Sequence, residues 1–200
     1  MAEELFSLSG PSEGFFRDRG SKFYAFASPV QSVEEVENNL SALRQQYYDA
    51  RHHCYAYRLG KHGEITFASD DGEPSHSAGA PILAAIRSFS LNYTAIIVVR
   101  YFGGTKLGVR GLIEAYRYSA EEAIKAGTLV PIIPKITFQL SYPYERTSDI
   151  NRILHRFDTE IVASEYNFAC RQTLAVKEID FPEIRNVLQQ AGFSPERISG

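Results

Sequence analysis

The chain has 200 residues, of which 44% are hydrophobic and 22% charged, and these values are typical of a packed globular protein and not of a disordered or fibrous one. Its net charge of −3 excludes a strong overall positive field, so any contact with nucleic acid must be a local patch. Two cysteines are too few for a disulfide framework, and no apolar run reaches the ~18–20 residues of a membrane span, so we expect a cytoplasmic protein without a membrane partner.

The first elements are marked by clear local signals. Ser32 and Glu35 have the spacing of a capping box, and the apolar residues behind them recur at helical steps, which predicts a helix from about Val33 to Gln46. Alternating segments on either side of this helix predict three strands, the last two forming a hairpin around Gly60 to Gly63. These strands are expected at Lys22–Ser28, His53–Leu59 and Glu64–Ser69.

Two further helices flank a buried strand. Pro81 favours a helix start, and the apolar spacing predicts a helix over Ala80–Phe89. The continuous β-branched run Ala95–Val99 is typical of the centre of a sheet. After a glycine-rich segment, a helix is marked by apolar residues from Leu112 to Ile124 and ends at Gly127.

The two prolines in Thr128–Pro134 indicate a linker between two domains, expected at residues 1–130 and 135–200. The second half alternates over Ile136–Tyr142, has a helical stripe from Ile150 to Phe157, and continues as two strands and a final helix that Asp180 caps. This β-α-β-β-α order, with a hint of a last strand at Ile198, suits a ferredoxin-like sandwich. The fold class is therefore expected to be α+β.

The segment Gly103–Gly111 lies between the buried strand and a helix, where free backbone N–H groups and the helix N-terminus attract an anion. Its spacing matches a Walker loop only in part, because Val109-Arg110 replaces the Lys-Ser/Thr pair. The alternative is a tight turn that needs glycine only for its backbone. The residues expected to bind an anion or nucleic acid are Arg100, Gly103, Gly104, Lys106, Gly108 and Arg110.

The segment from Ser69 to Ser77 carries three carboxylates within four positions, and these repel one another unless something compensates them. We expect it to line the same site as the glycine-rich segment, with an acidic oxygen within roughly 10 Å of the Lys106 or Arg110 charge, about one Debye length. The alternatives are a solvated turn and weak Mg²⁺ binding, although the spacing is not that of an EF-hand. The expected lining residues are Asp70, Asp71, Glu73, Ser75, His76 and His53.

The run His52-His53-Cys54 permits two other chemistries. On a strand only His52 and Cys54 share a face, so a zinc site would need His76 and an acidic residue as well. A thiol nucleophile at Cys54 would need a histidine base that nothing in the sequence brings to it. A half-buried structural thiol is the simpler interpretation, and no metal or cofactor is expected.

Taken together, four segments resemble the YigZ/IMPACT family: His53–Arg58, Ser69–Ser75, Ala78–Leu83 and Val98–Gly108. The resemblance implies a first domain like the second domain of a small-subunit ribosomal protein, also found in elongation factor G, and a ferredoxin-like second domain. It also implies nucleic-acid or ribosome-associated binding, and in eukaryotic members regulation of translation through a protein partner. His76 and Arg110 stand where the family usually has glycine.

Our hypothesis from the sequence is a non-enzymatic protein that binds RNA or the ribosome. A metal-assisted phosphohydrolase, with the acidic residues holding a metal and the basic ones the substrate, is the alternative. A protein-interaction module in translation control is a third possibility. The sequence indicates no oligomeric state.

Overall fold

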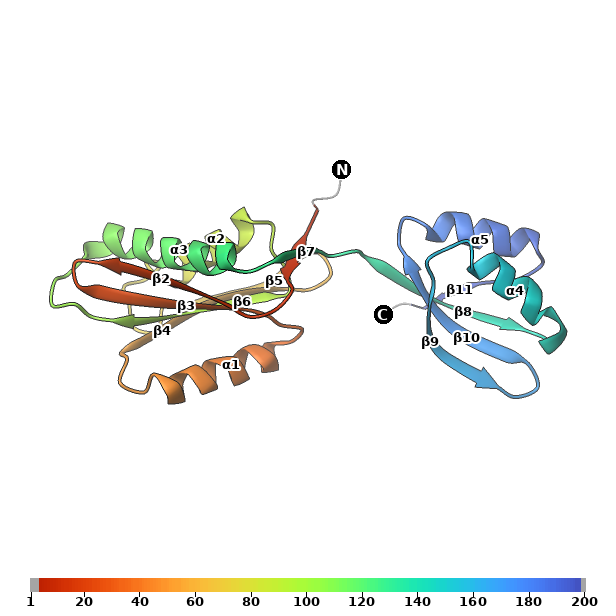
Figure 1. Ribbon diagram of the computed structural model, residues 1–200, viewed down its shortest axis with the longest axis horizontal. Helices are drawn as coiled ribbons and strands as arrows, with labels where there is room; N and C mark the ends of the chain where they lie inside the picture. The colour runs from red at the N-terminus through yellow and green to blue at the C-terminus, as the bar shows by residue number, and fades with distance from the viewer. Residues whose placement is uncertain (1–3, 199–200) are drawn as a thin grey trace. The chain divides into compact units, whose positions relative to one another are not determined.

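The computed structural model describes residues 4–198 and divides between Ile132 and Ile133 into two compact units. Both units combine helices with antiparallel sheets (Figure 1). The α+β class is thereby confirmed as a mixture of helices and several antiparallel sheets. None of the helices in the described part of the chain is long and apolar enough to cross a bilayer.

The first unit is built on a five-stranded antiparallel sheet in the order β2-β3-β6-β4-β5. Its strands are β2 (Ser12–Asp18), β3 (Ser21–Pro29), β4 (His52–Leu59), β5 (Ile65–Ser69) and β6 (Thr94–Tyr101). Its helices are α1 (Val33–Gln46), α2 (Gly79–Ser88) and α3 (Gly108–Ala126). Figure 1 shows α2 and α3 on one face of the sheet and α1 on the other. The β-branched run of β6 is therefore central and buried on both faces, as its sequence predicted.

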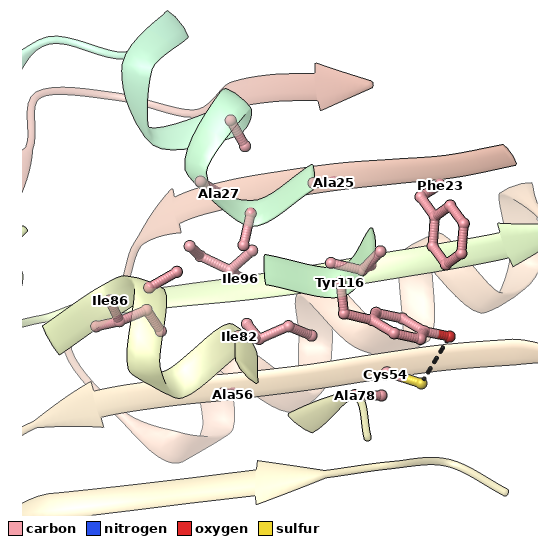
Figure 2. Packing of buried hydrophobic residues seen from close by; sticks show 14 of the residues in the cluster. Phe23, Ala25, Ala27, Cys54, Ala56, Ala78, Ile82, Ile86, Ile96 and Tyr116 are labelled. Atoms are coloured by element: carbon pink, nitrogen blue, oxygen red, sulfur yellow. Dashed lines mark hydrogen bonds between the residues drawn. The ribbon is translucent and has the colours of Figure 1, made fainter. Parts of the chain in front are cut away.

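The main core lies between the sheet and the helices α2 and α3 (Figure 2). Small residues of β3 and β4, such as Ala25 and Ala56, let the two helices approach the sheet closely. The ring of Tyr116 on α3 packs edge-on against Phe23 of β3, with centroids 5.1 Å apart. This aromatic pair fixes α3 over the end of the sheet at which β6 leaves it.

Several boundaries differ from the sequence-based expectation. The helix α3 begins at Gly108, so only the part of the glycine-rich segment up to Leu107 is a loop. The expected linker contains a strand, β7 (Leu129–Pro131), which pairs with β1 (Phe6–Leu8) and ties the end of the first unit to its beginning. Pro131 is compatible with this strand because β7 pairs only with β1 and is therefore an edge strand. Strands β1 and β2 were not predicted.

The second unit contains a four-stranded antiparallel sheet in the order β11-β8-β10-β9, with two helices on one face (Figure 1). Its elements are β8 (Lys135–Tyr142), the short 3₁₀ turn η1 (Tyr144–Arg146), α4 (Thr147–Leu154), β9 (Glu160–Tyr166), β10 (Cys170–Lys177), α5 (Phe181–Gln190) and β11 (Glu196–Ile198). The core gathers the inward residues of β8 and β10 with Ile150 and Ile184 from the helices. Asp180 stands at the start of α5 as expected, but its side chain makes no capping hydrogen bond.

Candidate functional site

The glycines after β6 are required by the backbone. A Cβ at Gly103 would lie 1.9 Å from the carbonyl carbon of Gly20, so two backbones touch here. Gly104 and Gly108 have φ angles of 88° and 74°, which side chains rarely tolerate. These glycines therefore shape the turn from β6 into α3, which is the simpler of the two roles considered for them.

The N-terminus of α3 is open. Its first residue follows Leu107, whose side chain cannot cap a helix, and the first turn contains no acidic residue. No side chain among residues 4–198 bonds to the first amide groups of this helix. Free N–H groups at a helix start carry a partial positive charge that favours an anion.

The N-terminus of α2 is, in contrast, occupied by the protein's own Asp70. One carboxylate oxygen accepts hydrogen bonds from the amides of Ala78 and Gly79, each at 2.9 Å, and the other accepts from His76 at 2.7 Å. Burial raises the pKa of Asp70, but the three backbone hydrogen bonds outweigh it and leave the pKa below its ordinary value. Asp70 is thus a helix cap whose carboxylate bonds to the protein's own backbone amides.

Asp71 is also used within the fold. Its carboxylate accepts from the amide of His53 at 2.7 Å and pairs with Arg44 of α1 at 3.0 Å. Its backbone oxygen accepts from the ring Nδ1 of His52 at 2.8 Å, which fixes that ring. The second carboxylate therefore joins α1 to β4.

Glu73 is the carboxylate that meets the basic segment. Its Oε1 accepts from Nη1 of Arg100 at 2.5 Å and from the hydroxyl of Tyr116 at 2.8 Å. The side chains of Glu73 and Arg100 are only 4% and 7% exposed, so this ion pair is buried. Nε2 of His52 lies 4.0 Å from the same oxygen.

The hydrogen-bond chain continues to the buried thiol of Cys54. Because the Tyr116 hydroxyl donates to Glu73, its oxygen can accept from the thiol, 3.3 Å away (Figure 2). Burial raises the pKa of both the Cys54 thiol and the Tyr116 phenol far above their usual range. Cys54 is therefore a structural thiol, as the simpler interpretation held, and is unsuited to nucleophilic attack.

A cavity of about 470 Å³ lies above this ion pair. Its walls come from the start of β4, the acidic segment, the end of β6 and the first turn of α3. The lining residues are Arg51, His52, Glu73, Pro74, Arg100, Phe102, Lys106, Leu107, Gly108, Val109 and Leu112. Lys106 and Arg51 make no ion pair with any residue that the structure describes, so both charges are available to a ligand.

The cavity gathers some of the expected site residues and leaves others out. Arg100, Lys106, Gly108 and Glu73 line it, so the acidic and basic segments do share one concave surface. The remaining expected residues lie outside the lining, namely Asp70, Asp71, Ser75, His76, His53, Gly103, Gly104 and Arg110.

Three of the residues outside the cavity have clear local explanations. Arg110 lies in the first turn of α3, where its side chain is 93% exposed and pairs with Glu114. His76 has a φ of 61°, which explains why glycine would suit its position. His53 is buried on the α1 face of the sheet, and burial lowers its pKa.

Sequence reasoning missed Arg51 and Phe102, and it considered His52 only as a zinc ligand that shares a strand face with Cys54. Phe102 follows directly after β6, and an aromatic ring that is 58% exposed beside a cationic segment is a binding signal. Arg51 carries no local signal, because it is close to the site only through the pairing of β4 with β6.

The acidic residues do not converge on one point. Asp70 bonds backbone amides, Asp71 bonds Arg44, and Glu73 bonds Arg100, so the carboxylates are not arranged as the ligand set of a metal-assisted hydrolase. Within residues 4–198, no group of three His, Cys, Asp or Glu side chains could hold a metal ion. The zinc arrangement considered for His52, Cys54 and His76 is not formed either.

The chain is similar to several known proteins. Residues 19–124 match the Impact N-terminal domain. The chain is 40% identical over 124 residues to IMPACT family member YvyE of Bacillus subtilis, covering 62% of this chain and 57% of that protein. It is 32% identical over 149 residues to IMPACT family member YigZ of Escherichia coli, covering 73% and 72% of the two chains. A crystal structure of a hypothetical protein, 26% identical, superimposes with a TM-score of 0.74 over 100% of this chain and 99% of its own.

Proposed function

The chain belongs to the IMPACT family, and we propose that it binds single-stranded RNA, free or exposed on the ribosome, through the cavity of its first unit. The observation that carries the proposal is the meeting of three features on one cavity. Lys106 and Arg51, which pair with no carboxylate in residues 4–198, lie beside the uncapped start of α3 and the exposed ring of Phe102. Proteins that bind single strands combine cationic grooves for the phosphates with aromatic rings for the bases.

The overall charge of −3 is consistent with this local mode of binding. The protein's other basic side chains near the site are already paired, Arg44 with Asp71 and Arg110 with Glu114. A small number of phosphate contacts is therefore expected, and the affinity is modest. A role in translation follows from the same proposal, because exposed single-stranded RNA is abundant on ribosomes. The strand order of the second unit suits the proposed ferredoxin-like fold, which adds a sheet surface.

Fluorescence anisotropy with a labelled ten-nucleotide RNA of mixed sequence tests the proposal. The logarithm of the binding constant should fall with the logarithm of salt concentration by about 0.7 for each phosphate contact on a single strand, so two to three contacts give a slope of about −1.4 to −2. Lys106→Ala should weaken binding and reduce the slope by about 0.7. Phe102→Ala should cost about 1–3 kcal/mol of affinity with little change in slope.

Lys125→Ala is the matched control. It removes the same charge from the opposite end of α3, where Lys125 is paired with Glu122 and is remote from the cavity lining. Its affinity and slope should equal those of the unaltered protein. Binding that does not depend on salt, or that responds equally to the two lysine variants, would contradict the proposal.

A further inference from the structure

Two residues that line the cavity, Arg100 and Glu73, each have a side-chain atom that the protein itself does not use. Nε of Arg100 is buried and has no hydrogen-bond partner within the described chain. Every bond of the Glu73 carboxylate goes to Oε1, which leaves Oε2 without a partner among residues 4–198. Both residues line the cavity. The free Oε2 of Glu73 can therefore accept a hydrogen bond from a ligand in the cavity.

The charges of the cavity fix the direction in which a nucleotide enters. The charges of Glu73 and Arg100 compensate each other, whereas Lys106, Arg51 and the start of α3 attract a phosphate. A phosphate group is therefore held beside these three and not at the ion pair. The base, which carries no charge, is the part of a nucleotide that reaches Glu73 and Arg100.

The size of the cavity limits what can enter. A volume of about 470 Å³ is in the lower part of the range for small-molecule sites, roughly 300–1,000 Å³. Leu107, Val109 and Leu112 provide an apolar wall against which a flat ring can pack. The cavity thus suits a single base, while the rest of a strand stays outside.

We propose that the pair Glu73–Arg100 binds the edge of one base and prefers guanine. This inference rests on the proposed function. A carboxylate oxygen can only accept hydrogen bonds. Guanine presents two adjacent donors, its ring N1–H and its N2 amino group, next to the acceptor O6. Its two donors therefore complement the free carboxylate oxygen of Glu73. Adenine, cytosine and uracil each offer fewer donors to the carboxylate.

The base preference is measured with an RNA of uridines that carries one central guanosine, inosine, adenosine or uridine. One guanosine cannot form a quadruplex, and inosine lacks only the N2 amino group. The RNA with guanosine should bind about 5- to 150-fold more tightly than the RNA with uridine, the range expected for one well-placed pair of hydrogen bonds. The affinity of the RNA with inosine should lie between these two. Equal affinities for the four RNAs would overturn the guanine preference while leaving RNA binding intact. Absence of binding to all four would instead refute the proposed function.

Glu73→Gln gives the corresponding test on the protein. The amide removes the charge but keeps the shape, so the guanosine and uridine RNAs should bind with similar affinity. A folded variant that still prefers guanosine would overturn the proposal. The change leaves Arg100 buried without its partner, so the variant is first checked by circular dichroism. If it does not fold, the comparison of guanosine with inosine on the unaltered protein decides the question.

Discussion

Replacing Gly103 by alanine should destabilise the first unit and displace the loop that carries Lys106. The added Cβ would lie 1.9 Å from the carbonyl carbon of Gly20 and 2.0 Å from the amide nitrogen of Ser21. Both are backbone atoms at the turn between β2 and β3, so no side chain can rotate away. Comfortable contact requires about 3.5 Å, so the two backbones must separate by about 1.5 Å.

The cost has two parts. Overpacking of a tight contact costs about 1–3 kcal/mol. The amide of Gly103 also donates to the hydroxyl of Ser21 at 3.1 Å, and losing this bond costs about 1 kcal/mol more. The free energy of unfolding of the first unit should therefore fall by about 2–4 kcal/mol. Amide hydrogen exchange in β3 and β6 measures this unit separately from the second one.

Two other glycines serve as controls. Gly10→Ala meets nothing within 4 Å and should change the free energy of unfolding by less than about 0.5 kcal/mol. Gly104→Ala meets no atom either, but its φ of 88° makes a side chain costly by about 1–2 kcal/mol. A Gly103→Ala protein as stable as the Gly10→Ala control would show that the two backbones do not touch, and our account of the loop would be wrong.

Three further predictions concern individual side chains. Asp70→Ala should lower the free energy of unfolding by about 1–2 kcal/mol, because the cap of α2 is lost. Because the pKa of Asp70 is lowered in the fold, its contribution to the free energy of unfolding is fully present above the ordinary pKa of 3.8 and is lost as the pH falls below it. The Asp70→Ala variant should not show this acid-induced loss of stability. The buried thiols of Cys54 and Cys170 should react with a thiol reagent only after denaturation, and rapid reaction in the native state would contradict their burial. The hydroxyl of Tyr101 donates to Asp49, which raises the pKa of the phenol to about 12, so Asp49→Asn should shift its ultraviolet titration towards 10; an unchanged titration would exclude this bond.

The elements that could be predicted from the sequence are those whose local signals agree with their tertiary contacts. The helix α1 begins as expected, because Ser32 accepts a hydrogen bond from the amide of Glu35. Strand β2 gave no such signal, since it contains Gly14 and two adjacent phenylalanines. Gly14 is needed because a Cβ there would lie 2.3 Å from the backbone of α3. A residue that weakens the strand signal is thus demanded by a contact more than a hundred positions away.

The site could be predicted as two segments but not as a set of contacts. The local excess of positive charge around Lys106 predicted an anion site; a cavity lies at that position, and anion binding there stays a prediction. The pairing of distant strands decides which glycine is structural and which helix start is uncapped. Arg51 reaches the cavity only because His52, next to it, pairs with Arg100 across β4 and β6. No spacing in the sequence encodes that register.

The three clustered carboxylates have partners that their spacing in the sequence does not reveal. Their density demands compensation, and the nearest concentration of positive charge in the sequence suggested that the basic segment supplies all of it. The fold instead compensates each carboxylate separately. Backbone amides donate to Asp70, and Arg44 forms an ion pair with Asp71. Only Glu73 pairs with a residue of the basic segment. Because that partner is Arg100, Lys106 has no carboxylate to pair with among residues 4–198. Had Glu73 paired with Lys106, the charge beside the open start of α3 would be neutralised and the cavity would have little attraction for an anion. The proposed phosphate site therefore depends on which of these two basic residues, 6 positions apart in the sequence, pairs with Glu73.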